Sequence, residues 1–248
     1  MKKLILSITA LTIFLFACKK SGTDTPQNNG LPTSAETKAQ FNNTSFGVYK
    51  GVIIGSSGTI IFRINNGDNI VKGYLTFDSQ KDTLSTTTTL VAGQPITNVL
   101  FVGRISSMRL SANADGSNAM LSNIQINGHN NVTGFIIHEN SNKQVLCYEG
   151  TFTGGASGII NATRVGLNNN DTTFILSKVQ SVNDTTLYRG FGGTVNDTAR
   201  VNLYLPGGGS PQFQIVGMYN TGNFNPNTFN GTWSGGYGNG QFTSHRTY

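Results

Sequence analysis

Cysteine, acidic residues and helix-forming patterns are all scarce in this 248-residue chain. The two cysteines, Cys18 and Cys147, are too few for the disulfide framework of a small secreted domain. The three histidines, His129, His138 and His245, lack the spacing of a metal site. The chain also contains no Gly-x-Ser-x-Gly turn and no phosphate-binding glycine loop, so the sequence indicates neither a common hydrolase nor a nucleotide-binding enzyme. We expect no cofactor.

The positive charge of the chain lies mostly near its N-terminus. The formal net charge is +6, from 17 basic and 11 acidic residues. Without Lys2 and Lys3 the balance is fifteen to eleven, a net charge of +4. Leaving out residues 18–40 as well gives twelve to nine, or +3, with no basic run. A nucleic-acid partner is therefore not expected.

The N-terminus has the layout of a secretory signal. Lys2 and Lys3 precede an uncharged, weakly polar to apolar run of fourteen residues, Leu4 to Ala17. As a helix this run would rise about 21 Å, against roughly 30 Å for the hydrocarbon core of a bilayer. The run therefore predicts a cleaved signal at residues 1–17 and not a membrane-spanning anchor.

The end of this run resembles the lipobox of bacterial lipoproteins. Leu15, Phe16 and Ala17 stand directly before Cys18, where the apolar run stops and two lysines follow. The resemblance implies that Cys18 receives a diacylglycerol and becomes the first residue of the mature protein. An ordinary secretory signal with an incidental cysteine is the alternative. Because Lys19 is not the aspartate of inner-membrane retention, the resemblance favours a lipid anchor in the outer membrane of a Gram-negative bacterium, with the face of the membrane left open.

Residues 18–40 predict a flexible tether. Small polar residues, glycine and proline dominate this segment, and it has few apolar side chains to offset the entropy of ordering. Under the lipoprotein interpretation Cys147 is then the one free thiol. It stands in a strand-like apolar run, which predicts a buried, inert side chain.

From residue 41 to the C-terminus the sequence predicts an all-β region. Apolar and polar residues alternate in runs such as 57–64, 119–126, 199–205 and 212–216. Turn signals rich in Asn, Asp and Gly separate these runs. We expect about 14 to 16 short strands in an antiparallel meander that forms a barrel or a sandwich. Two packed halves, 41–165 and 166–248, are a further expectation.

One hairpin pattern recurs along this region. Gly150 to Arg164 matches Gly231 to Arg246 with one inserted residue, Trp233 standing for Phe152 and Phe242 for Ile160. A Tyr-charged-Gly triplet opens at Tyr49, Tyr148 and Tyr188. The pattern predicts a repeated β-hairpin with glycine at the bend and an aromatic residue facing inward. This hairpin resembles the closing strands of small antiparallel β-barrels in extracytoplasmic bacterial proteins.

The C-terminal stretch offers a candidate binding site. Aromatic residues alternate with asparagines between positions 219 and 242. Flat rings beside amides suit sugars, which stack on the rings and hydrogen-bond to the amides. The candidate ligand-binding residues are Trp233, Tyr237 and Phe224. A filled β-core with turn asparagines is the alternative, and Trp233 in particular fits a core position.

Four Asp-Thr pairs resemble the O-glycosylation signal that some Gram-negative bacteria use on exported proteins. The resemblance implies modification at Thr83, Thr172, Thr185 and Thr198, all of which fall in predicted turns. The alternative is that Asp-Thr pairs form turns through side-chain to backbone hydrogen bonds.

Three functional interpretations follow from the sequence. The first is a non-enzymatic, membrane-anchored envelope lipoprotein that binds a glycan or another small ligand. The second is a structural or assembly lipoprotein that contacts other envelope proteins. The third is a hydrolase whose active-site groups come from distant strands.

Overall fold

The computed structural model describes residues 30–166, 171–181, 184–220 and 227–248. Sixteen β-strands and one short 3-10 helix, η1 (Ala39–Phe41), make up its regular structure, with no α-helix in the described ranges. All of the strands belong to one compact unit, 31–248. The predictions of an all-β fold and of about 14 to 16 strands are confirmed.

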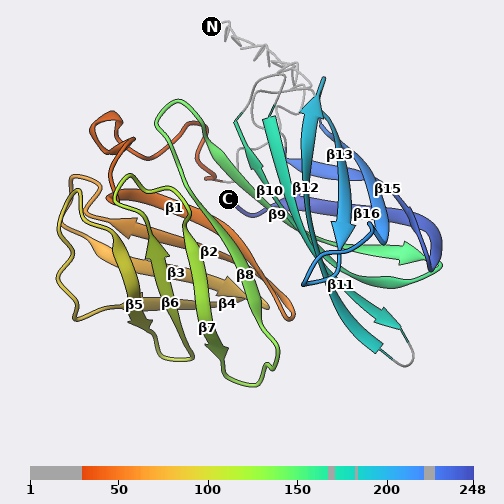
Figure 1. Ribbon diagram of the computed structural model, residues 1–248, viewed down its shortest axis with the longest axis horizontal. Helices are drawn as coiled ribbons and strands as arrows, with labels where there is room; N and C mark the ends of the chain where they lie inside the picture. Colours follow the sequence, from red (N-terminus) through yellow and green to blue (C-terminus); the bar gives the residue numbers. More distant parts are fainter. Residues whose placement is uncertain (1–29, 167–170, 182–183, 221–226) are drawn as a thin grey trace, which may run out of the picture. The chain divides into compact units, whose positions relative to one another are not determined.

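The strands form two consecutive sets of eight, which we call the first and second repeat (Figure 1). The first repeat contains β1 (Gly47–Ile54), β2 (Ser57–Ile64), β3 (Val71–Phe77), β4 (Gln80–Ser85), β5 (Ile96–Val102), β6 (Ser106–Ala112), β7 (Met120–Ile126) and β8 (Thr133–His138). The second repeat contains β9 (Val145–Gly154), β10 (Ser157–Val165), β11 (Asp171–Ser181), β12 (Asp184–Val195), β13 (Thr198–Tyr204), β14 (Phe213–Tyr219), β15 (Thr228–Gly235) and β16 (Gly238–Arg246).

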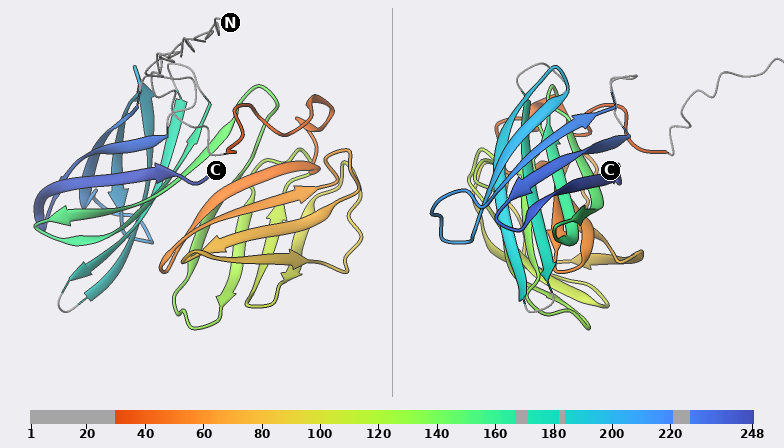
Figure 2. Two further views of the ribbon diagram at one scale, coloured as in Figure 1. Left: turned by 180° about the vertical axis from the view of Figure 1, so that it is seen from behind. Right: turned by 90° about the vertical axis from the view of Figure 1, so that its right-hand side faces the viewer.

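Both repeats are antiparallel meanders whose last strand returns to the first. In the second repeat β16 pairs with β9 as well as with β15, which closes a barrel (Figure 2). In the first repeat β8 pairs with β1, whereas β7 and β8 contact each other without forming a ladder. The first repeat ends at His138 and the second begins at Val145. The sequence suggested a junction near Gly166, but Gly166 follows β10 within the barrel.

The repeated sequence pattern corresponds to two neighbouring hairpins. The matched segments are β9–β10 and β15–β16, and they lie side by side because β16 pairs with β9. The equivalent residues Phe152 and Trp233 both point into the barrel, where their ring centroids lie 5.6 Å apart. The predicted hairpin with an inward aromatic is confirmed.

The interior of the barrel is filled by side chains. Its apolar core combines aromatic residues such as Phe213, Phe229 and Phe242 with aliphatic ones. Glycine makes room for the rings: a Cβ atom at Gly217 would lie 2.3 Å from the ring of Phe229. The space left between Phe213 and Trp233 amounts to about 10 Å³, roughly the room that one water molecule needs. This part of the barrel interior therefore has no room for a ligand larger than water.

The two repeats pack through the outer faces of their opening hairpins. Val52 and Ile54 of β1 form a small apolar cluster with Cys147 and Leu176. Beside this cluster, Glu149 accepts hydrogen bonds from the hydroxyl groups of Ser57 and Thr59, each at 2.7 Å. Asn161 donates from Nδ2 to the carbonyl oxygen of Ile53 at 2.8 Å. The interface between the repeats is therefore apolar at its centre and satisfied by hydrogen bonds at its side.

The segment that precedes β1 is attached to the first repeat by charge. Lys50 is fully buried, and its Nζ lies 2.6 Å from Glu139 Oε1 and 3.0 Å from Glu36 Oε2. Glu36 also pairs with Arg63. Thr37 is buried, and its N–H donates to Glu139. Residues from Leu31 to Gln40, which the sequence assigns to the tether, thus include several that contact the folded strands.

Candidate functional site

Two of the three aromatic residues that the sequence proposed as a binding site, Trp233 and Tyr237, do not share an exposed surface. Trp233 is 3% exposed inside the barrel, where its Nε1 donates to the carbonyl oxygen of Thr153 at 3.0 Å. Tyr237 lies in the β15–β16 turn, 42% exposed, and stacks on Phe213. Phe224 lies outside the described residues. The core interpretation of Trp233 is confirmed by this burial. Every second residue of a barrel strand points inward, and Trp233 is one of these residues in β15.

The four candidate glycosylation threonines lie in strands, so the prediction that they fall in turns is wrong. Thr83 is an exposed residue of β4, Thr172 is half-buried in β11, and Thr198 is the first residue of β13. Thr185 belongs to β12, and its side chain lies outside the described residues.

The aspartates that precede Thr83 and Thr172 have structural partners of their own. Asp82 accepts hydrogen bonds from Ser106 Oγ at 2.7 Å and from the backbone N–H groups of Arg104 and Ile105. Asp171 pairs with Arg164 of the neighbouring strand at 2.9 Å. Asp82 also accepts a hydrogen bond from the N–H of the adjacent Thr83 at 3.0 Å. Both aspartates lie in strands and bind groups of neighbouring segments of the fold.

Of the two cysteines, Cys18 lies outside the described residues, and Cys147 is fully buried in β9. Burial raises the pKa of the Cys147 thiol to about 12. A thiol in this state is almost entirely protonated at neutral pH and is a poor nucleophile. The prediction of a buried, inert side chain is confirmed.

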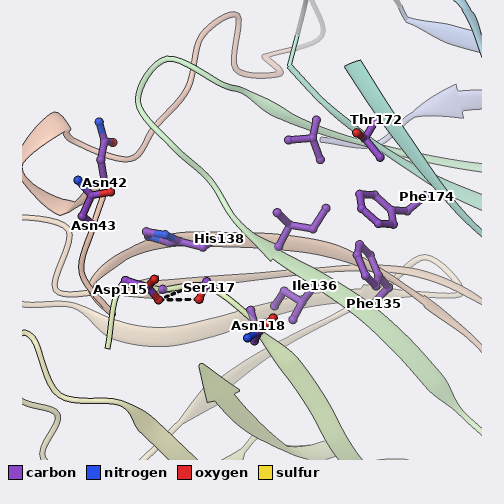
Figure 3. Close-up of a pocket in the computed structure, with 14 residues that line it drawn as sticks. Asn42, Asn43, Asp115, Ser117, Asn118, Phe135, Ile136, His138, Thr172 and Phe174 are labelled. Carbon is purple, nitrogen blue, oxygen red and sulfur yellow. Dashed lines mark hydrogen bonds between the residues drawn. The ribbon is translucent and has the colours of Figure 1, made fainter. Parts of the chain in front are cut away.

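A hollow with one polar side lies where the first repeat does not close. We call it the seam pocket (Figure 3). It has a volume of about 630 Å³ and lies between the β6–β7 turn, β8, and strands β10 and β11 of the second repeat. Its lining consists of Asn42, Asn43, Asp115, Gly116, Ser117, Asn118, Ala119, Phe135, Ile136, Ile137, His138, Val165, Thr172 and Phe174.

The β6–β7 turn presents the polar side of the seam pocket. Gly116 has φ +83°, a left-handed conformation that glycine adopts without strain. Ser117 donates from its N–H and its Oγ to Asp115 Oδ1, at 2.9 and 2.6 Å. These hydrogen bonds hold the pKa of Asp115 below its usual value, so the carboxylate is ionised at neutral pH. Figure 3 shows Asp115, Ser117 and Asn118 together on one side of His138.

His138 forms the base of the polar side. Its Nε2 donates to the carbonyl oxygen of Phe46 at 2.9 Å, and its ring lies 4.7 Å from that of Tyr49. Burial lowers the pKa of His138 below its ordinary value of 6.5, although the Phe46 carbonyl and the charge of Asp115 act in the opposite direction. The imidazole is therefore neutral at pH 7. Ser117 bonds to Asp115 and His138 bonds to the backbone, so the three side chains do not form a Ser-His-Asp relay.

The other side of the seam pocket is aromatic. Phe135 of β8 and Phe174 of β11 stack with ring centroids 4.4 Å apart and an interplanar angle of 25°. Figure 3 shows this pair opposite the Asp115 side of the pocket. Both rings are half-buried, which leaves part of their surface to a ligand.

A second hollow begins at the same aromatic pair. It has a volume of about 670 Å³ and lies between β8 and the outer face of β11 and β12. We call it the apolar groove, because aliphatic and aromatic side chains dominate its lining. These residues are Val52, Thr133, Gly134, Phe135, Phe174, Ile175, Leu176, Leu187, Tyr188, Arg189, Gly190, Phe191, Tyr204, Leu205, Pro206 and Gly208.

Comparisons give no known protein from which to transfer a role. Neither family models, nor curated proteins, nor solved structures match this chain. Within the described residues, no group of three or more His, Cys, Asp or Glu side chains is placed to hold a metal ion. The described part of the chain also holds no helix with the length and hydropathy needed to cross a membrane.

Sequence reasoning missed the aromatic pair and identified only parts of the polar side. The turn at 113–116 was visible from its Asn, Asp and Gly residues. His138 was noted as an isolated histidine. Phe135 and Phe174 carried no signal, because they come from different repeats and meet only through the packing of those repeats.

Proposed function

We propose that this protein is a membrane-anchored, non-enzymatic binding protein of the bacterial cell envelope, and that it binds a carbohydrate in the seam pocket. One observation supports this most strongly: a stacked aromatic pair faces a group of amide, hydroxyl and carboxylate side chains across a pocket of about 630 Å³. A sugar ring has an apolar face and a rim of hydroxyl groups, so it matches both sides of this pocket.

Each side of the pocket would supply a different part of the binding energy. Phe135 and Phe174 offer apolar surface to the face of a pyranose ring. Asn118 can donate and accept, and ionised Asp115 can accept hydrogen bonds from hydroxyl groups. Pockets of this size commonly combine apolar walls with a few placed polar groups.

The lining favours binding over hydrolysis. Glycoside hydrolysis by the usual mechanisms needs two carboxyl groups on opposite sides of the bond that breaks. Among the described residues that line the seam pocket, Asp115 is the one carboxylate. The neutral His138 already uses its Nε2 for the Phe46 carbonyl.

The cellular part of the proposal rests on the N-terminal sequence. Residues 1–17 would act as the signal and Cys18 as the lipidated residue, with attachment to the outer membrane. The Cys18→Ala protein should leave the membrane fraction, and a signal-peptidase inhibitor should leave uncleaved wild-type precursor. A Cys18→Ala protein that still fractionates with membranes would refute the lipid anchor. O-glycosylation of Thr83, Thr172, Thr185 and Thr198 belongs to the same proposal, and Thr172 lines the seam pocket.

A glycan array followed by calorimetry tests the ligand. The wild-type protein should bind at least one sugar class on the array. Phe174→Ala should weaken that binding by about tenfold, and Asn118→Ala by about fivefold. Tyr237→Ala is the matched control, because it removes an exposed aromatic that does not line the pocket. An array without sugar binding, or equal losses in Tyr237→Ala and Phe174→Ala, would refute a carbohydrate site here.

A second function has one observation in its favour. Met218 is 57% exposed and Val195 is 56% exposed on the outer face of the barrel. Thr198 of β13 lies between them, because it pairs with Val195 of β12 and with Met218 of β14. Exposed apolar residues that gather on one face are typical of protein contacts. Under this alternative the protein is a structural or assembly lipoprotein. Met218→Lys should then abolish co-purification of envelope partners without changing sugar binding.

A further inference from the structure

The apolar groove has a floor of paired outward-facing side chains. On the outside of the barrel, Phe174 pairs with Phe191, Leu176 with Arg189, and Lys178 with Leu187 across the β11–β12 ladder. Arg189 in turn pairs with Tyr204 of β13. Phe191 is 68% exposed, so much of its ring faces solvent. These pairs create an apolar strip that an extended hydrocarbon chain could cover, with about 25 cal/mol gained per Å² of apolar surface removed from water.

Arg189 is the exception in this floor. It is exposed, it lines the groove, and it stands between Leu176 and Tyr204. Within the described part of the chain, its guanidinium takes part in no ion pair. Lys178, which is nearby in the ladder, donates instead to the carbonyl oxygen of Gly55. A positive charge on an apolar floor therefore remains free to bind an anionic group with charge-assisted hydrogen bonds.

The backbone on the barrel side of the groove favours a hydrocarbon chain over a peptide. β11 is paired on both sides, by β10 and β12, and β12 is paired with β11 and β13. An extended peptide needs partners for its own N–H and C=O groups, and these strands have already used theirs. An alkyl chain has no such groups, so it can lie on the floor without leaving polar atoms unsatisfied.

We propose that the apolar groove binds an acidic amphiphile, whose alkyl chain lies against Phe174, Leu187 and Phe191 and whose carboxylate or phosphate group binds Arg189. Phe174 lines both hollows, whereas Arg189 and Phe191 line the apolar groove and not the seam pocket, so variants at these two positions test the groove separately from the carbohydrate site. The carboxylate of a fatty acid and the phosphate of a lipid headgroup share the chemistry that the groove recognises.

Calorimetry with soluble probes below their micellar concentrations tests this site. Decanoate and decyl phosphate serve as the two anionic probes, dodecanoate as the longer chain, and decanol as the uncharged chain. Dodecanoate should bind roughly tenfold more tightly than decanoate, because two more methylene groups leave water. The tighter of decanoate and decyl phosphate identifies the headgroup that the groove prefers.

Three variants connect this binding to the groove. Arg189→Gln should weaken decanoate and decyl phosphate by about fivefold to tenfold while changing decanol by less than about twofold. Phe191→Ser should weaken all of the probes. Arg200→Gln is the matched control, because Arg200 is an exposed arginine of the neighbouring strand β13 that does not line the groove.

Several results would overturn the site. These are no binding of decanoate or decyl phosphate, no dependence on chain length, or an equal effect of Arg189→Gln and Arg200→Gln. Binding of an apolar peptide without binding of any amphiphile would overturn it too. Sugar binding measured on Phe191→Ser separates this inference from the proposed function: retained sugar binding with lost amphiphile binding shows two independent sites.

Discussion

The first strands of the two repeats share a Tyr-charged-Gly triplet, and both repeats are eight-stranded meanders. They differ in how the last strand is paired. In the second repeat, β16 has a ladder partner on each side and the barrel closes over a filled core. In the first repeat, β8 has a ladder with β1 alone, and the seam pocket lies between the start of β7 and the end of β8. The seam pocket thus lies where the first repeat lacks the ladder that closes the second.

Irregularities in the first repeat explain why it stays open. The β5–β6 ladder shifts register between Ile96 and Val99, and the β6–β7 ladder shifts between Ser107 and Arg109. Asn98 and Asn123 adopt positive φ within these strands. Bulges of this kind bend and twist the strand that carries them. The bulged strands β6 and β7 carry the turn that forms one side of the pocket.

The largest expected effect comes from the core of the closed repeat. Trp233→Ala removes a buried indole from a barrel interior with almost no free space, and it should lower the free energy of unfolding by about 4 kcal/mol. Tyr237→Ala, at the exposed turn of the same hairpin, should change it by less than about 0.5 kcal/mol. Urea denaturation measures both. A similar cost for the two variants would mean that the barrel interior is not packed as described.

Equivalent glycines test closure directly. Gly51 of β1 faces β8 and Gly150 of β9 faces β16, and an added Cβ would lie 1.9 Å from Phe135 O and 2.1 Å from Thr243 O, respectively. β8 can move away because it has no second ladder, whereas β16 is held on both sides. Gly150→Ala should therefore cost about 3 kcal/mol and Gly51→Ala about 1 kcal/mol. Equal costs in denaturation experiments would show that the first repeat is as constrained as the barrel.

The features of the closed barrel could be predicted from the sequence better than the pocket of the first repeat. Alternation and turn residues predicted the all-β class, and the match between Gly150–Arg164 and Gly231–Arg246 predicted a hairpin that now proves to occur twice in the barrel wall. The inward position of Trp233 followed from the same alternation. These features are local, because period and turn chemistry act over a few residues.

The pocket could not be predicted in the same way. Phe135 and Phe174 lie in different repeats, and nothing in their neighbouring residues indicates that their rings stack. Asp82 and Asp171 were assigned to turns from their Asp-Thr pairs, yet both lie in strands, and they bind Ser106 of β6 and Arg164 of β10. Long-range partners are set by how the sheets curl and pack, which a single sequence does not reveal.

A smaller effect on the free energy of unfolding is expected where β4 meets β5 in the first repeat. β4 and β5 share a single paired position, Ser85 with Val102, and the carboxylate of Asp82 bonds to Ser106 and to the N–H groups that precede it. Asp82→Asn should lower the free energy of unfolding by about 2 kcal/mol.

The pH dependence of this effect identifies its cause. Burial alone would raise the pKa of Asp82, but the Ser106 hydroxyl and the backbone N–H groups lower it below its ordinary 3.8. Its contribution is therefore present above about pH 4 and is lost as the pH falls further. Acid denaturation of wild type and Asp82→Asn should converge at low pH, and a difference that persists there would assign the effect to shape and not to charge.

The smallest expected effect concerns the base of the seam pocket, which has no counterpart in the closed barrel. Because burial lowers the pKa of His138 below 6.5, the unfolded chain binds a proton at this residue more readily than the folded protein does. Stability should therefore be complete above about pH 6.5 and decrease as the pH falls below it. Urea midpoints between pH 5 and pH 8 should show this decrease in the wild type and a weaker one in His138→Gln, which keeps a side-chain donor and retains His129 and His245. Identical pH profiles in the two proteins would show that the folded protein binds a proton at His138 as readily as the unfolded chain does. The His138 side chain would then be less buried than its hydrogen bond to Phe46 implies.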